Sequence, residues 1–260
     1  MLKTIKISIS ALSGLILFLT PLAQAVEFPA ASAAGTDPSC QFQDYAKALE
    51  EATKNPSEDY GEAIRAELKI RHDWLRAILN CSNFETKKLK NALREFQPND
   101  AELDRLRNQI LAQLEDVSQY YDLQLSKVDD HGLRSTKDAA RAIIDWRAGT
   151  HSIVAERAGN LMLWSKNKDL FASARARYDL IGQTIRRLNL MEQEEIRGKY
   201  EAAGKSLSQA ESLNSSARKL LLQSANPDTT KVIKDSLENL SQTYKSFFEL
   251  SEGIKELLPI

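Results

Sequence analysis

Cysteine, histidine and methionine are scarce in this 260-residue chain, which holds two cysteines, three histidines and three methionines. A structural zinc site takes four ligands, mostly cysteine and histidine, yet no carboxylate, cysteine or second histidine stands three or four positions after His151. The chain also lacks a nucleophile elbow, a phosphate-binding loop, an HExxH motif, an EF-hand loop and the paired Glu-x-x-His motifs of di-iron bundles. We therefore expect no metal, no cofactor and no catalytic residues, and so a protein that is not an enzyme.

Neither sign of charge dominates, because 35 lysines and arginines stand against 36 aspartates and glutamates, which leaves a net charge of −1. A nucleic-acid binder usually carries a basic excess that neutralises phosphates, so we expect no nucleic-acid partner. The chain has 42% hydrophobic and 27% charged residues, which is typical of a globular protein and not of a disordered one.

Long apolar runs are also missing, except near the N-terminus. There Lys3 and Lys6 precede the apolar residues 7–19, and Ala23-Gln24-Ala25 supplies a small-x-small cleavage site. This layout predicts a secretory signal peptide over residues 1–25, and its apolar run is shorter than the roughly 20 residues of a membrane-spanning helix. We expect a secreted, periplasmic or cell-surface protein that does not insert into a membrane after cleavage. The alternative is an uncleaved signal that anchors the chain by its N-terminus.

Prolines are few after residue 35, and each lies where a helical pattern stops or starts, because a proline inside a helix costs about 3 kcal/mol. They are Pro38, Pro56, Pro98, Pro227 and Pro259. No segment alternates apolar and polar residues as a strand does, whereas apolar residues recur at helical spacing throughout. The sequence predicts an all-α fold of long antiparallel helices, over residues 38–55, 59–96, 99–128, 135–189, 189–225 and 233–258.

The fourth predicted helix is nearly twice as long as its neighbours, and its length suggests how the helices pack. Its first half can form a three-helix bundle with the second and third helices, and its second half can form another with the last two. The shared helix is an arrangement like that of spectrin repeats, as an analogy of architecture alone. We expect an Ala/Ser linker over 26–37, an N-terminal bundle over 38–165 and a C-terminal bundle over 166–260. One elongated helical bundle, folded back near residues 166–169, is the alternative.

Cys40 and Cys81 are the only cysteines, in a chain that we expect to reach an oxidising compartment. Cys81 lies on the second of two apolar faces of its helix, and the first helix is the obvious partner for that face. The sequence therefore predicts a disulfide, worth about 4 kcal/mol for a loop of this length in the chain-entropy model. A catalytic or redox thiol is the alternative, but the chain has no CxxC motif to support it.

Residues 143–164, IIDWRAGTHSIVAERAGNLMLW, mix apolar and small residues with several charges. On a regular helix of about 100° per residue, one apolar face gathers Ile143, Trp146, Thr150, Ile153, Leu161 and Trp164. Arg147, His151 and Arg157 fall inside or beside the apolar arc. We interpret the stretch as core, with stems that pack and charged heads that reach water or a partner carboxylate. The alternative is an anion or small-ligand site between helices, built by these three residues.

The absence of any catalytic constellation favours a binding or structural role. Our first hypothesis is an exported, non-enzymatic helical-bundle protein that interacts with another protein or a component of the cell envelope, as a monomer. The alternative function is an extracytoplasmic ligand-binding or sensor bundle with its site near Arg147, His151 and Arg157.

Overall fold

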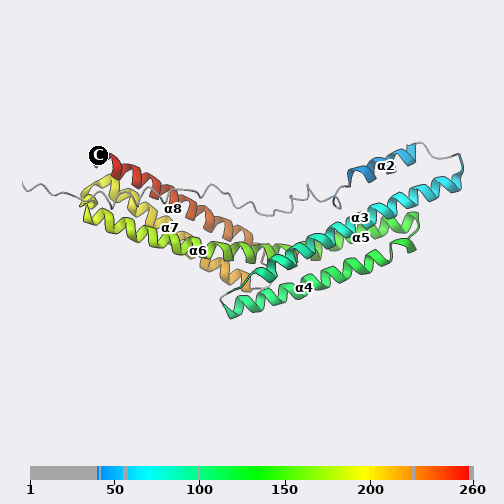
Figure 1. Ribbon diagram of the computed structural model, residues 1–260, viewed down its shortest axis with the longest axis horizontal. Helices are drawn as coiled ribbons and strands as arrows, with labels where there is room; N and C mark the ends of the chain where they lie inside the picture. The colour runs from blue at the N-terminus through cyan, green and yellow to red at the C-terminus, as the bar shows by residue number, and fades with distance from the viewer. Residues whose placement is uncertain (1–39, 41, 55–57, 99, 224–225, 258–260) are drawn as a thin grey trace, which may run out of the picture. The chain divides into compact units, whose positions relative to one another are not determined.

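The computed structural model, drawn in Figure 1, describes residues 40, 42–54, 58–98, 100–223 and 226–257. The predicted signal peptide over 1–25 and the predicted linker over 26–37 lie outside the described residues. Phe42–Ile260 form one compact unit, and all the helices named below belong to it.

The long elements of the described chain are all α-helices, and no strand occurs among the described residues, so the expected all-α class is confirmed. The helices are α2 (Gln43–Lys54), α3 (Tyr60–Glu95), α4 (Ala101–Ser126), α5 (Leu133–Trp146), α6 (Ser152–Arg187), α7 (Glu194–Leu222) and α8 (Thr229–Leu257). A π-helical turn, η4 (Arg147–His151), joins α5 to α6, and the connections hold the 3-10 turns η3 (Val128–Asp130) and η5 (Leu190–Glu192). None of the described helices combines the length and the apolar character that crossing a membrane requires.

Short polar residues set the helix ends. Asp59 and Asp100 accept hydrogen bonds from backbone N–H groups of the first turns of α3 and α4, which satisfies donors that have no partner inside the helix. The fourth predicted helix starts at Leu133, two residues before the predicted start at Ser135. Ser135 instead lies inside the first turn of α5. Its hydroxyl oxygen accepts the N–H of Gly132 at 2.8 Å, and α5 begins at once after that glycine. The fifth predicted helix starts at Glu194 and not at Asn189, because the left-handed backbone of Asn189 (φ 55°) separates α6 from η5.

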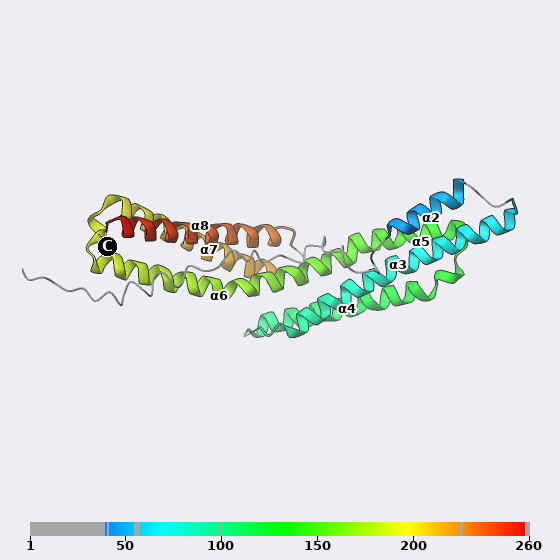
Figure 2. The same cartoon turned by 45° about the horizontal axis from the view of Figure 1, so that its top comes forward.

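The continuous helix made by α5, η4 and α6 contacts two groups of helices. Figures 1 and 2 show α5 and α6 following one line, with α3 and α4 beside one part and α7 and α8 beside the other. α3 packs against α2, α4 and α5, while α7 and α8 pack along each other and against α6. α6 also contacts α3 and α4, so its first turns belong to both groups.

Two tyrosines and two glycines set the approach of α6 to α7. Tyr178 of α6 and Tyr200 of α7 stack with ring centroids 4.4 Å apart. The hydroxyl of Tyr178 lies against Gly204 of α7, and the hydroxyl of Tyr200 lies against Gly182 of α6. A Cβ atom on either glycine would lie less than 3.0 Å from the facing hydroxyl oxygen, closer than real Cβ contacts. Glycine at both positions therefore permits the tyrosine stack.

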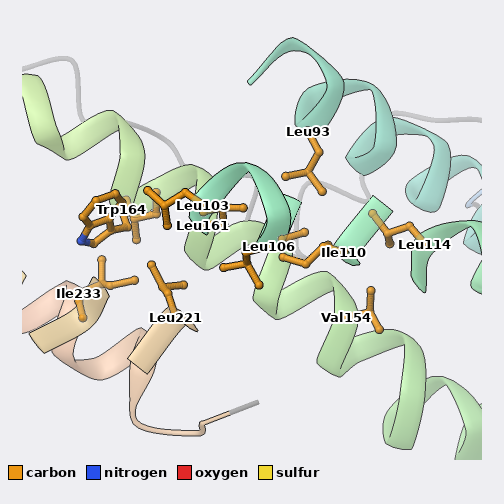
Figure 3. Packing of buried hydrophobic residues seen from close by; sticks show 13 residues of the cluster. Leu93, Leu103, Leu106, Ile110, Leu114, Val154, Leu161, Trp164, Leu221 and Ile233 are labelled. Carbon is orange, nitrogen blue, oxygen red and sulfur yellow. The ribbon is translucent and has the colours of Figure 1, made fainter. Parts of the chain in front are cut away.

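The core continues across the predicted boundary between residues 165 and 166. One buried cluster takes side chains from α3, α4, α6, α7 and α8, and Figure 3 shows Leu161 and Trp164 of α6 among them. Two further clusters join α3, α4 and α5 around Tyr121, and α6, α7 and α8 around Leu207. Because the first cluster ties five helices together, the division into two tandem bundles stays a prediction, as does its alternative of one bundle.

Candidate functional site

The most unusual backbone in the described chain is the π-turn Arg147–His151, inside the stretch that mixes apolar residues with charges. The N–H of Ser152 bonds to the carbonyl oxygen of Arg147, five residues back instead of the four of an α-helix. A turn that holds an extra residue shifts the helical register, so the apolar face expected from regular spacing holds only in part. Ile143, Leu161 and Trp164 are buried as expected. Thr150 is exposed and Ile153 is 43% exposed, whereas His151 is buried.

His151 lies between α3 and α4 and is 3% exposed. Its Nδ1 is 2.8 Å from the hydroxyl of Tyr121, and its Nε2 is 3.4 Å from Oγ1 of Thr86. Thr86 Oγ1 is also 2.8 Å from the carbonyl oxygen of Ser82. Because a carbonyl oxygen can only accept, Thr86 uses its one hydroxyl hydrogen in this bond and has none left for His151. Nε2–H of the histidine is therefore the donor to Thr86, and Nδ1 accepts from Tyr121, which fixes one neutral tautomer.

Burial keeps both members of the Tyr121–His151 pair uncharged. Burial, and to a smaller extent the positive charge of Arg147, lower the pKa of His151 from 6.5 to about 4. Burial also raises the pKa of Tyr121, and the net value is about 12 although the charge of Arg147 and a hydrogen bond with Ser82 act in the opposite direction. Both groups are thus neutral at neutral pH, so neither is poised to exchange a proton there.

Arg147 is used inside the protein. Its Nη1 donates to Oγ of Ser82 at 2.5 Å, and its Nη2 donates to the carboxylate of Glu85 at 2.6 Å. Hydrogen bonds consequently link Glu85, Arg147, Ser82, Tyr121, His151 and Thr86 into one cluster, which we call the π-turn cluster. An anionic ligand at Arg147 would have to displace Glu85, so the cluster serves chiefly to hold α3, α4 and the π-turn together.

The predicted disulfide is present next to this cluster. Both cysteines of the chain, Cys40 and Cys81, are disulfide-bonded. Cys81 is buried and directly precedes Ser82 in α3, so the covalent link reaches the helical turn that carries the Arg147 partners. Sulfur in a disulfide has no thiolate, and in this state neither cysteine is a nucleophile or a metal ligand.

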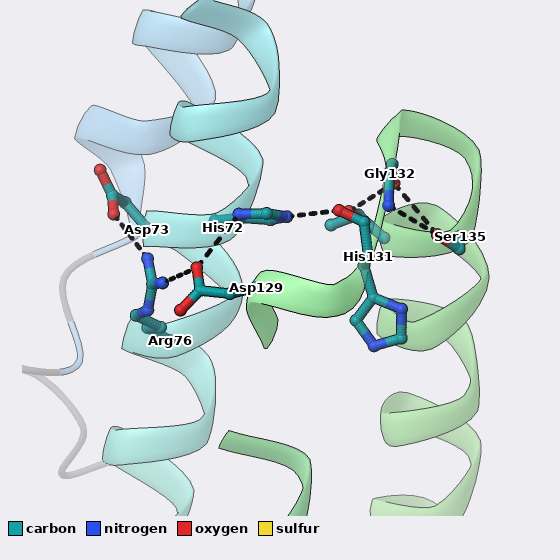
Figure 4. Close-up of polar contacts among 8 residues, drawn as sticks. His72, Asp73, Arg76, Asp129, His131, Gly132 and Ser135 are labelled. Atoms are coloured by element: carbon teal, nitrogen blue, oxygen red, sulfur yellow. Dashed lines mark hydrogen bonds and ion pairs between the residues drawn. The ribbon is translucent and has the colours of Figure 1, made fainter. Parts of the chain in front are cut away.

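The turn between α4 and α5 is fastened to α3 by polar contacts, drawn in Figure 4. The buried His72 donates from Nε2 to the carbonyl oxygen of His131 at 2.7 Å. Arg76 pairs with the carboxylate of Asp129 and also donates to Asp73 at 3.1 Å. These contacts therefore hold the turn against α3. The carboxylate of Asp129 is already paired with Arg76.

Arg157 lies apart from the other two residues of the predicted ligand site. It follows Arg147 by ten residues, about 15 Å along a helix at 1.5 Å per residue. Its Nη1 donates to Oε1 of Gln113 on α4 at 2.9 Å, and it lines a cavity that the π-turn cluster does not reach. The structure therefore brings Arg147 and His151 together but does not place Arg157 with them.

Sequence reasoning missed Ser82 and Thr86, although a signal for them exists. The buried residues Leu75 and Leu79 are continued at helical spacing by Ser82 and Thr86, and then by Leu93. Polar residues that continue an apolar stripe need buried partners. The hydroxyl of Tyr121 and the ring of His151 were candidates for those partners in the sequence.

Comparison with protein families, with curated proteins and with solved structures finds no match. Function is therefore inferred from the side chains of this chain and their contacts. The described groups with the largest pKa shifts are Tyr121, His151 and Tyr178. All three are bonded to neighbours within the chain and are neutral at neutral pH.

Proposed function

We propose that the protein is an exported helical-bundle protein, without enzymatic activity, that binds another protein or a component of the cell envelope. The observation that carries the proposal is the disulfide between Cys40 and Cys81, because disulfides persist in oxidising compartments and are rare in the cytosol. The signal-peptide pattern of residues 1–25 supports the same location.

The state of the buried polar groups supports binding over catalysis. A catalytic acid or base needs a pKa near the working pH and access to its substrate. His151 has a pKa of about 4, Tyr121 has one of about 12, and both are buried in contact with each other. Arg147, the cation of this cluster, is neutralised by Glu85. These groups stabilise the helix packing on which an interaction surface depends.

Large apolar side chains on the outside of the helices are candidates for the contact with a partner. Ile144 of α5 is 60% exposed, Leu180 of α6 is 56% exposed and Phe248 of α8 is 52% exposed. Apolar and aromatic side chains of this kind are the usual anchors at the centre of protein interfaces.

The test is site-specific photo-crosslinking of the full chain in the cell that exports it. A photoreactive amino acid replaces Ile144, Leu180 or Phe248, and the exposed polar residues Lys137 and Gln183 receive it as controls. We expect a discrete crosslinked species from at least one apolar position and from neither control. Exported, oxidised protein that crosslinks at none of the apolar positions contradicts the proposal.

A further inference from the structure

A cavity of about 200 Å³ lies where α4, α6 and the connection from α7 to α8 meet. We propose that this cavity binds a small carboxylate with an apolar body, and that the guanidinium of Arg157 holds the carboxylate. The site is distinct from the π-turn cluster, and it does not depend on the proposed binding partner.

The surface of the cavity wall is mostly apolar, with polar groups from α6 and from Gln223, Asn226 and Thr229 at the connection from α7 to α8. Its apolar side chains include Leu106, Ile110, Ile153 and Leu221. Figure 3 shows Leu106 and Leu221, from α4 and α7, turned toward a common space. Arg157 and Asn160 supply polar atoms on the α6 side. An apolar cavity with a few converging polar groups is the usual form of a small-molecule site.

Arg157 differs from three other partly buried arginines of these helices. Arg147, Arg175 and Arg218 each form an ion pair with a carboxylate. The hydrogen bond of Arg157 goes to the neutral amide of Gln113, and among the described residues no carboxylate forms an ion pair with it. Burial lowers its pKa, with no opposing effect from an acid. A partly desolvated cation without a counter-charge is costly, so a carboxylate ligand gains by supplying one.

Glu156, the acidic residue next to Arg157 in the sequence, forms its hydrogen bond with another residue. Glu156 also lines the cavity, but its Oε1 accepts the hydroxyl hydrogen of Thr230 on α8 at 2.6 Å. Asn160 donates to the same hydroxyl oxygen at 2.9 Å, which ties α6 to α8 at this point. Glu156 thus leaves Arg157 without an ion pair, while its negative charge at the wall disfavours dianions. The ligand is therefore expected to carry a single negative charge.

The volume limits the size of the ligand. Pockets for drug-sized molecules measure roughly 300–1,000 Å³, and this cavity is smaller. A carboxylate attached to one ring or a short alkyl chain fits the available space and the apolar wall. Benzoate is a simple compound with both features, and its fluorinated analogue 4-fluorobenzoate can be observed by ¹⁹F NMR.

The experiment is a ligand-observed ¹⁹F NMR titration of the full, oxidised chain with 4-fluorobenzoate. Saturable broadening is expected for the wild-type protein. Arg157→Met keeps an unbranched apolar stem and removes the guanidinium with its charge, and we expect it to weaken binding at least about tenfold. Arg186→Met removes the same charge from an exposed position of α6 and serves as the matched control, with unchanged binding. The neutral analogue 4-fluorobenzamide should bind wild type at least about tenfold more weakly than the carboxylate.

A second variant tests the cavity itself. Ile153→Phe adds bulk at a partly exposed position of the wall and leaves Arg157 in place. We expect this variant to fold, as checked by circular dichroism, and to lose the saturable broadening. The proposal is overturned if wild type shows no saturable binding, or if Arg157→Met binds 4-fluorobenzoate as wild type does. Retained binding in folded Ile153→Phe would place the carboxylate outside this cavity and also overturn it.

Discussion

Acid should weaken the fold through His151, and by an amount that follows from its burial. In the folded protein the imidazole is neutral with a pKa of about 4, whereas in the unfolded chain its pKa returns to 6.5. The folded-state pKa is depressed, so this stabilising contribution is complete above pH 6.5 and is lost as the pH falls through about 4. The loss amounts to about 2 kcal/mol by pH 5 and about 3 kcal/mol by pH 4.

Denaturant unfolding followed by far-UV circular dichroism measures this effect, with His151→Gln as the reference. The quantity of interest is the free energy of unfolding of wild type minus that of the variant at each pH, because the shared carboxylates then cancel. We expect the difference to fall by about 2–3 kcal/mol between pH 7 and pH 4. Tyr121→Phe should cost about 1–3 kcal/mol at pH 7 yet keep the wild-type pH dependence, since burial is the main cause of the shift. A pH-independent difference between wild type and His151→Gln would refute the reasoning.

Three other predictions concern the packing of α6 against α7, the π-turn and the disulfide. Gly204→Ala should lower the free energy of unfolding by about 1–3 kcal/mol, because the new Cβ meets the hydroxyl of Tyr178. Gly198 lies on the same helix with open space around it, and Gly198→Ala should raise the free energy of unfolding by about 0.5–1 kcal/mol. Equal effects of the two variants in thermal melts would rule out the close approach of Tyr178 to Gly204. Val154 is buried and Ile153 is partly exposed, so Val154→Asn should lower the free energy of unfolding by about 2–3 kcal/mol and Ile153→Asn by less than about 1 kcal/mol. Urea titrations that give the reverse order would show a regular α-helix instead of the π-turn. Cys81→Ser should lower the free energy of unfolding by about 4 kcal/mol relative to the oxidised wild type, and an unchanged urea midpoint would mean that the disulfide constrains nothing.

Most of the fold could be predicted because its signals are local. Asp59 and Pro98 mark helix ends by rules that involve only a few neighbouring residues, and the apolar spacing between such ends predicts a helix. The disulfide followed from the presence of only two cysteines in a chain with an export pattern. The predicted starts at Ser135 and Asn189 failed because Gly132 and the left-handed backbone of Asn189 determine the ends there.

The candidate site could be predicted only in part, because its geometry depends on distant segments. The π-turn has no local sequence rule, and it brings His151 into contact with Thr86 and Tyr121 at the expense of Thr150. Regular helical counting across residues 147–151 therefore placed Thr150 on the core face, although its side chain is exposed. Arg147 and Arg157 look alike in the sequence, and only the positions of Glu85 and Gln113 on other helices distinguish a paired arginine from an unpaired one.

The mass of the intact protein from a secreting host tests the proposed export and oxidation most directly. Native mass spectrometry, with a reduced and denatured control, should give a chain that begins at Val26 and is two hydrogens lighter than its reduced form. Cleavage and oxidation together place the protein where the proposed binding occurs. A chain that keeps residues 1–25 and two free thiols would contradict the proposal that this is an exported, disulfide-linked binding protein.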